Sequence, residues 1–292
     1  LVLASLSNNV VTITNLNSAA TSAVGININV ITGGSLSITG GHLQAGTGIQ
    51  CQEVTDTPIT IRGTQLTVTT NYNILFNKPI LGQSPIVIDG VVGVGAAAAW
   101  GLVFQVAMSG GDVTVTDTTL GCINTAFLFA TDVDTSTITA SGLTLTSTTA
   151  AQYAMTFTGT VSDSAVSIAS STLTAAGNGL RCQGDLTNVV LSLADVTVPA
   201  GASKGILLKD ASGGSVSITG GNIAASSMCI QILALANTPV TIRGVQLTPT
   251  AGFSIYFAMA ITGTSPIVIE DVVSGGNPAW GIVFQLGVTG GD

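Results

Sequence analysis

The sequence has few charged residues, few aromatic residues and a single histidine. Charged residues make up 7% of its 292 residues, against roughly a quarter in ordinary globular proteins. Six lysines and arginines stand beside fourteen aspartates and glutamates, which gives a net charge of −8. Proteins that bind nucleic acid neutralise phosphates with many cationic side chains. The scarcity of basic residues therefore argues against nucleic acid as a partner.

Catalytic motifs are also scarce. The single histidine, His42, is replaced by Asn222 at the matching place of a second, similar block of sequence, and no Ser-His-Asp motif is present. The glycine pairs, such as Gly33-Gly34, are followed by no helical segment, so we interpret them as turns and not as phosphate-binding loops. We expect a protein without enzymatic activity and without a cofactor.

One apolar stretch is long enough to cross a membrane as a helix. Residues 90–108 carry no charge, and Gln105 is their one strongly polar residue. The matching residues 271–288 contain Asn277 and Pro278, and the gap between the flanking strands is that of an ordinary repeat unit. We therefore interpret the stretch as part of the repeat and expect no membrane span in this window.

The four cysteines do not fall on adjacent repeat units. Cys182 and Cys229 are two units apart, which corresponds to roughly 10 Å at the spacing of β-strands. A disulfide requires Cα atoms within about 7 Å of each other. We therefore expect buried free thiols at Cys51, Cys122, Cys182 and Cys229.

The strongest positive signal is a long internal repeat. The block 35–112 returns as the block 215–292, with equal length. Within these blocks, Thr57–Gly63 (Thr-Pro-Ile-Thr-Ile-Arg-Gly) returns as Thr238–Gly244 with one Ile changed to Val. A fixed period indicates a repeat architecture. We expect residues 1–292 to form one continuous solenoid and to be a window of a longer array.

Each long repeat contains shorter units of strand, turn and strand. A φ-polar-φ motif, in which φ is an apolar residue, recurs at intervals of roughly 23–30 residues, within the range of solenoid repeats. Short alternating runs broken by Gly, Asn and Asp indicate β-strands, and no segment shows a sustained helical period. Units of this length predict an all-β parallel β-helix of about eleven coils, with right-handed winding. The central apolar residues are Ile13, Ile38, Ile61, Ile88, Val115, Ile138, Ile168, Leu193, Ile218, Ile242 and Ile269.

Equivalent positions of stacked coils form ladders, and two ladders are visible in the sequence. In the charged ladder, Arg62 is followed one unit later by Asp89, and Arg243 by Glu270, which predicts ion pairs between neighbouring coils. In the aromatic ladder, six units carry Phe at the same strand position, which predicts a stack of rings inside the solenoid. These residues are Phe76, Phe104, Phe129, Phe157, Phe257 and Phe284.

The recurrent unit V-T-I-x-G-x-x-L…G-I-x-φ resembles the coils of right-handed parallel β-helices of the pectin-lyase-like superfamily. Thr238–Gly244 and Gly48–Cys51 carry parts of this motif. The resemblance covers the whole chain and implies the fold, not an activity. The composition, rich in Ser, Thr and Val, also resembles that of long solenoid surface proteins of protists, such as the dispersed-gene-family proteins of trypanosomes.

A few side chains are candidates for binding sites. Asp112, Asp134 and Asp163 lie near the turns that end three successive units, and a column of carboxylates could bind Ca²⁺. Aspartate is also common in turns because its side chain bonds nearby backbone groups, and we favour that interpretation. Trp100 and Trp280 could stack on sugars, although packing at a corner of the coil is the simpler role.

These patterns favour a structural or surface-display repeat protein, extracellular or at the cell surface. Its partners would be further copies of its own repeat, or neighbouring subunits, joined end to end into filaments. The alternative is a β-helix that binds or processes carbohydrate, with glycans as partners. Ice binding is a third hypothesis, because Thr12 and Thr14, and likewise Thr137 and Thr139, flank their central residues with outward hydroxyl groups.

Overall fold

The structure is a computed structural model that describes residues 1–82, 84–93 and 97–289, with residues 19–22 described by their backbone alone. Two segments discussed above extend beyond these described residues. Residues 290–292, which end the second copy of the long repeat, and part of the apolar stretch 90–108 lie outside the described residues.

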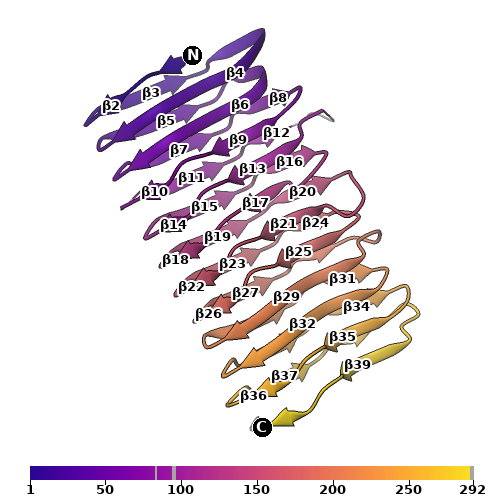
Figure 1. The fold of residues 1–292 in the computed structure, drawn as a ribbon. Helices are drawn as coiled ribbons and strands as arrows, with labels where there is room; N and C mark the ends of the chain where they lie inside the picture. Colours follow the sequence, from indigo (N-terminus) through magenta and orange to yellow (C-terminus); the bar gives the residue numbers. More distant parts are fainter. Residues whose placement is uncertain (83, 94–96, 290–292) are drawn as a thin grey trace.

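The chain winds through stacked coils that advance steadily from one end of the molecule to the other (Figure 1). All recorded strand pairings are parallel, and one sheet takes a single strand from each coil, so its eleven strands mark about eleven turns. The prediction of an all-β parallel solenoid is confirmed, while the right-handed winding stays a prediction. The strands of this eleven-stranded sheet are β3 (Val10–Thr14), β5 (Ser35–Thr39), β7 (Ile59–Arg62), β11 (Ile86–Asp89), β15 (Asp112–Thr116), β19 (Thr137–Ser141), β23 (Ala165–Ala169), β27 (Val190–Ala194), β30 (Ser215–Thr219), β33 (Val240–Arg243) and β37 (Ile267–Glu270).

The remaining 29 strands form a second sheet that bends around the core as three ladders. The strands β4 (Asn17–Thr32) and β6 (His42–Thr55) run through all three ladders, and β29 (Lys204–Ser212) and β32 (Met228–Ala236) run through the middle and third. Among the described residues, no helix is long and apolar enough to span a membrane.

The first ladder follows the eleven-stranded sheet along the chain and consists of β8 (Gln65–Val68), β12 (Val92–Gly93), β16 (Thr119–Cys122), β20 (Thr144–Ser147), β24 (Thr172–Thr174), β28 (Thr197–Val198), β31 (Asn222–Ala225), β34 (Gln246–Pro249) and β38 (Val273–Ser274). The middle ladder consists of β1 (Val2–Leu3), β9 (Tyr72–Phe76), β13 (Trp100–Phe104), β17 (Phe127–Phe129), β21 (Tyr153–Phe157), β25 (Asn178–Cys182), β35 (Phe253–Phe257) and β39 (Trp280–Phe284). The third consists of β2 (Leu6–Ser7), β10 (Ile80–Leu81), β14 (Met108–Ser109), β18 (Val133–Asp134), β22 (Val161–Ser162), β26 (Leu186–Thr187), β36 (Ile261–Thr262) and β40 (Val288–Thr289).

The predicted register is wrong in one coil. The residue aligned with Val115 and Ile168 is Ala140, not Ile138, which instead pairs with Val113. Side chains alternate with a period of two along a strand, so a shift of two positions keeps the same face buried, and the pattern alone could not choose. The correction makes the two coils on either side of this position more equal in length than the sequence pattern suggested.

This shift also moves one of the predicted hydroxyl pairs. Thr139 and Ser141 flank Ala140, whereas Thr137 is aligned with Asp112. The outward column that begins at Thr14 and Thr39 is broken by charged side chains at Arg62 and beyond. The outer face of the eleven-stranded sheet is therefore not the flat, uninterrupted array of hydroxyl groups on which the ice-binding hypothesis depends.

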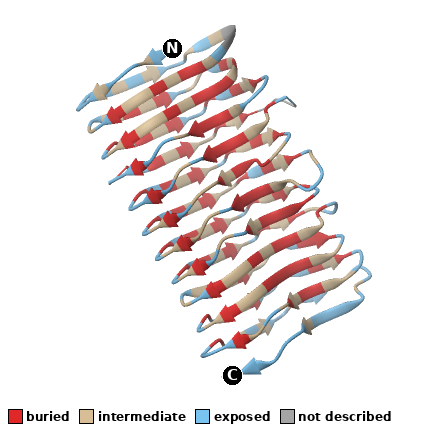
Figure 2. Ribbon diagram, viewed as in Figure 1, coloured by how far each residue is buried: buried red, intermediate tan, exposed pale blue. Residues whose placement is uncertain are grey.

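A stack of phenylalanine rings occupies the core of the solenoid, as predicted. The rings of Phe76, Phe104, Phe129 and Phe157 follow one another with centroids 4.7 to 4.8 Å apart and planes within 5° of parallel. Phe257 and Phe284 repeat the arrangement at 4.7 Å. Figure 2 shows that buried residues recur in the strands of successive coils. Offset stacking of rings adds to the free energy gained by burial.

The four cysteines are buried free thiols, as predicted. Cys51 and Cys182 continue the phenylalanine column, pairing with Phe76 at one end and Phe157 at the other. Burial raises the pKa of both thiols to about 12. A thiol with such a pKa stays protonated at neutral pH, so these side chains act as small apolar residues in the core.

The predicted ion pairs between neighbouring coils are present. Arg62 Nε lies 3.6 Å from Asp89 Oδ2, and Arg243 Nη2 lies 2.5 Å from Glu270 Oε2. Thr116 on the following coil donates a 2.7 Å hydrogen bond to Asp89, so that carboxylate is shared among three coils. All four charged side chains are substantially exposed, and such pairs contribute at most about 1 kcal/mol each. Their main effect is to favour one register.

A left-handed residue follows the strand of the eleven-stranded sheet in every coil. Its φ lies between 46° and 65°, a conformation that Gly, Asn and Asp adopt at least cost. In the first ten coils its backbone N–H donates to a carbonyl of the next coil at 2.8 to 3.1 Å. The turn residue thus extends the ladder of backbone hydrogen bonds between neighbouring coils. These residues are Asn15, Gly40, Gly63, Gly90, Asp117, Gly142, Ser170, Asp195, Gly220, Gly244 and Asp271.

Removing one ring from the stack should open a cavity. We predict that Phe104→Ala lowers the free energy of unfolding by about 3–5 kcal/mol, because Phe104 is fully buried between two stacked rings. Urea denaturation measures this change. Phe253→Ala is the matched control, since it removes the same side chain from the partly exposed outer face. Equal losses in the two variants would contradict the internal stack.

Candidate functional site

The outward face of the middle ladder carries the side chains that vary most in chemistry from coil to coil. In β13 the adjacent residues Gly101 and Leu102 are both buried, which marks a bend in the strand. Trp100, just before the bend, is partly exposed. The same pattern of one partly exposed residue followed by two buried ones recurs in β21 and β35. In these coils the bend therefore presents a large aromatic side chain at a corner of the solenoid.

This corner gathers the amphipathic aromatic residues of the chain. All three tyrosines and both tryptophans lie on strands of the middle ladder and are partly or largely exposed. Trp280 is 65% exposed, and Phe253 stacks on Tyr256 with ring centroids 4.8 Å apart. The tryptophans do occupy a coil corner, as expected, but they present ring surface to solvent there. The outward aromatic residues are Tyr72, Trp100, Tyr153, Phe253, Tyr256 and Trp280.

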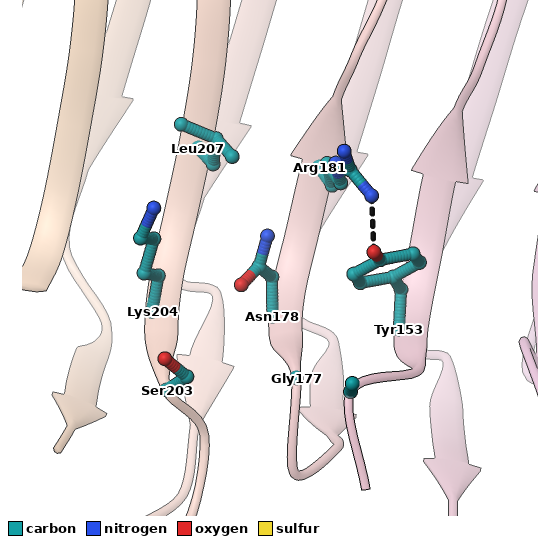
Figure 3. A pocket seen from close by; sticks show the side chains of 8 residues that line it. Tyr153, Gly177, Asn178, Arg181, Ser203, Lys204 and Leu207 are labelled. Atoms are coloured by element: carbon teal, nitrogen blue, oxygen red, sulfur yellow. Dashed lines mark hydrogen bonds between the residues drawn. The ribbon is translucent and has the colours of Figure 1, made fainter. Parts of the chain in front are cut away.

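A basic pocket interrupts the aromatic row. Tyr153, Asn178 and Lys204 are register partners on three successive coils, and Arg181 stands on the same outward face beside them (Figure 3). Together with Ser203 they line a pocket of about 250 Å³. Residues that lie one or two coil lengths apart in the sequence thus become neighbours through coil stacking.

The tyrosine holds the arginine in place. The guanidinium carbon of Arg181 lies 4.6 Å from the centroid of the Tyr153 ring, and Arg181 Nη1 donates a hydrogen bond to the Tyr153 hydroxyl. A cation above an aromatic face is attracted by the ring quadrupole. The guanidinium is therefore positioned at the pocket by a neutral partner, which leaves its charge uncompensated.

The two lysines of β29 have opposite electrostatic environments. Burial and the nearby charge of Arg181 lower the pKa of Lys204 below its ordinary value. A hydrogen bond to Asp185, together with the negative charge of that carboxylate, raises the pKa of Lys209, whose Nζ lies 2.9 Å from Asp185 Oδ1. Positive charge is thus disfavoured inside the pocket and favoured further along the same strand.

Two hydrogen-bond donors in the pocket have no partner within the described part of the chain. Asn178 is 7% exposed, and its side-chain amide makes no recorded hydrogen bond but is not fully buried. Arg181 Nε is buried and likewise unpaired. A buried polar group without a partner costs about 1–3 kcal/mol. The pocket therefore contains donors that an acceptor from outside the chain could satisfy.

The three aspartates of the predicted calcium site occupy three different register positions. Asp112 Oδ1 accepts a hydrogen bond from the Thr137 N–H at 3.1 Å. Asp134 accepts from Ser162 and Thr135, which lowers the pKa of its carboxyl group. Asp163 adopts a φ of 46° in a turn and accepts from the Asn188 amide at 3.0 Å.

Each of these carboxylates therefore accepts a separate hydrogen bond from the following coil. No group of three or more His, Cys, Asp or Glu side chains within residues 1–82, 84–93 and 97–289 is placed to hold a metal ion. The calcium site remains a prediction from the sequence alone. His42, the single histidine of the sequence, lies on the surface, and its Nε2 is 2.9 Å from Thr67 Oγ1.

The basic pocket itself was not anticipated from the sequence. A signal was present, since two of the six basic residues, Arg181 and Lys204, are separated by about one coil length. The signal became interpretable only with the register, which places Lys204 beside Asn178 and Arg181 beside Leu207. A comparison with known proteins finds no family model, curated protein or solved structure that matches this chain.

The opposite environments of the two lysines can be measured directly. We predict that Lys204 titrates below, and Lys209 above, the ordinary lysine pKa, because burial and Arg181 act on the first and Asp185 on the second. NMR of ¹³C-dimethylated lysines as a function of pH reports both values in one sample, with Lys209 as the internal control. Indistinguishable titration curves would contradict the assigned environments.

Proposed function

We propose that the protein is a structural or surface-display solenoid, located outside the cell or at its surface. One observation carries this proposal: the coils repeat the same parallel strand ladders along the described chain, with one strand of the eleven-stranded sheet in each. The long sequence repeat reproduces the same positions further along the rod. In repeat proteins of this kind, length is set by the number of coils stacked on one another.

The stacking of coil on coil supports end-to-end contacts with further copies. Phe104 and Leu102 are fully buried by the next coil, and their counterparts Phe284 and Ile282, in the last described coil, are 45% and 48% exposed. Such a face is complementary to another coil of the same cross-section. Because all the strands are parallel, head-to-tail stacking preserves the register and builds a filament.

The location and superfamily of the protein belong to the same proposal. The coil motif resembles that of pectin-lyase-like β-helices, and the parallel solenoid is the fold that this resemblance implies. The low charge and the abundance of Ser and Thr support a hydroxyl-rich outer surface, as in the protist surface solenoids named above. Antibody labelling of intact source cells would test the location, and an exclusively intracellular signal would refute it.

Sedimentation velocity of the whole chain tests the structural role. We expect association that increases with protein concentration, and rods in electron micrographs whose length grows in steps of about 50 Å, the height of eleven coils at strand spacing. Ile282→Lys should abolish association by placing a charge on the exposed coil face. Leu81→Lys is the control, because Leu81 is also exposed but lies on the third ladder of an internal coil.

Two results would count against this role. The first is a folded chain that stays monomeric at every concentration. The second is equal association of the Ile282→Lys and Leu81→Lys variants, which would show that the contacts are not made through the coil face.

Carbohydrate binding is a second candidate, favoured by the row of outward aromatic residues. Aromatic rings exposed at regular spacing provide flat apolar surfaces against which sugar rings can pack. The neighbouring coils place Tyr72 and Trp100 in register, as they do Phe253 and Trp280. The row supports binding; processing of a polysaccharide would in addition need carboxylates beside the bound sugar.

Tryptophan fluorescence tests this candidate, because both tryptophans lie in the row. Neutral oligosaccharides should shift the emission, and Trp100→Ala should weaken binding about three- to tenfold, the loss expected for one stacked ring. Leu81→Ala, remote from the row, should bind like the parent protein. A panel of oligosaccharides that leaves the emission unchanged would rule the candidate out.

A further inference from the structure

The basic side chains of this acidic protein fall into two groups. Within the described residues, Arg62, Lys209 and Arg243 each form an ion pair with a carboxylate. The other three form no recorded ion pair: Lys78 is exposed on the surface, whereas Arg181 and Lys204 both line one pocket. Two cations placed together repel each other, and a chain with fourteen acidic residues offers many carboxylates that could have compensated them.

The polar side chains that surround these cations can donate hydrogen bonds. Asn178 stands between Tyr153 and Lys204 in the register, is largely buried, and directs its unpaired amide into the pocket (Figure 3). Ser203 adds a hydroxyl group at the rim. No carboxylate lines the pocket. Convergent donors with net positive charge and no acidic neighbour are complementary to an oxyanion.

The pocket also has apolar walls. The ring of Tyr153 forms one wall beneath the guanidinium, and Leu207 closes another. The ring also fixes the guanidinium before any ligand arrives, which lowers the entropy lost on binding. A ligand that carries an oxyanion on a compact body would therefore contact both the cations and the apolar walls.

We propose that the pocket lined by Tyr153, Asn178, Arg181, Ser203 and Lys204 binds the carboxylate, sulfate or phosphate group of a small ligand. Arg181 and Lys204 supply the charge, and Asn178 and Ser203 donate hydrogen bonds. Leu207 replaces the arginine on the next coil, and Tyr153 replaces the lysine two coils earlier. The site is thus a single feature of one place on the rod, and it depends on neither end-to-end assembly nor sugar stacking.

Isothermal titration calorimetry on the whole chain tests the proposal. The probes are sodium sulfate, sodium phosphate and galacturonate, each compared with sodium chloride at equal ionic strength, with galactose as the neutral match to galacturonate. We expect one binding event per chain for at least one of the three oxyanions, and none for chloride or galactose. The probe with the highest affinity identifies the class of anion.

Single substitutions distinguish a specific binding site from attraction of anions to the overall charge of the protein. Lys204→Gln should weaken binding about 10- to 100-fold, the loss expected for one charge-assisted hydrogen bond. Asn178→Ala, which preserves the charge, should weaken it about two- to tenfold. Lys209→Gln is the matched control, because it removes one positive charge from the same strand outside the pocket, and it should stay within twofold of the parent.

Thermal melting without anion provides the folding control. Lys204→Gln should melt no lower than the parent, since it removes a repulsive contact with Arg181. The proposal is overturned if none of the three oxyanions binds above the chloride baseline. It is also overturned if Lys204→Gln and Lys209→Gln weaken binding equally, since that result would indicate attraction to overall charge.

Discussion

The register between successive coils is the constraint on which the rest of the structure depends. It is held by parallel backbone ladders and by the left-handed turn residue that follows each strand of the eleven-stranded sheet. Where this residue is Asp or Asn, its side chain reaches toward the next coil. A Cβ on Gly142 would lie 2.3 Å from Asp117 Oδ1, and one on Gly220 would lie 2.1 Å from Asp195 Oδ1. At these two turns the position above the aspartate has room only for glycine, which helps to fix which coil positions meet.

Once the register is fixed, each residue meets its equivalents on the neighbouring coils. Rings then stack on rings in the core, and the thiols at Cys51 and Cys182 extend the same column. Stability in such a molecule is a sum over neighbouring coils. A substitution in the core is consequently felt most by the coils that touch it, and a coil face without a neighbour, such as that of Phe284, exposes apolar surface.

The outward face of the middle ladder is less constrained by this stacking, since its side chains need only tolerate their neighbours. It carries aromatic rings on several coils and two uncompensated cations on two others. The outer face of the eleven-stranded sheet, in contrast, carries small hydroxyl side chains and compensated charges. One solenoid thus presents one side of mainly small side chains and paired charges and another side on which a specific site can form.

The sequence by itself determined the coil architecture, because a long repeat of fixed period and alternation within short runs leave few other folds. It also determined the phenylalanine stack and the pairing of Arg62 with Asp89, since both need only the spacing of equivalent positions. It could not distinguish Ile138 from Ala140, because a shift of two positions buries the same face of a strand. Nor could it reveal the pocket at Arg181 and Lys204. Their meeting depends on side-chain direction at a bend and on Asn178 from the coil between Tyr153 and Lys204, and only the stacked structure brings those groups together.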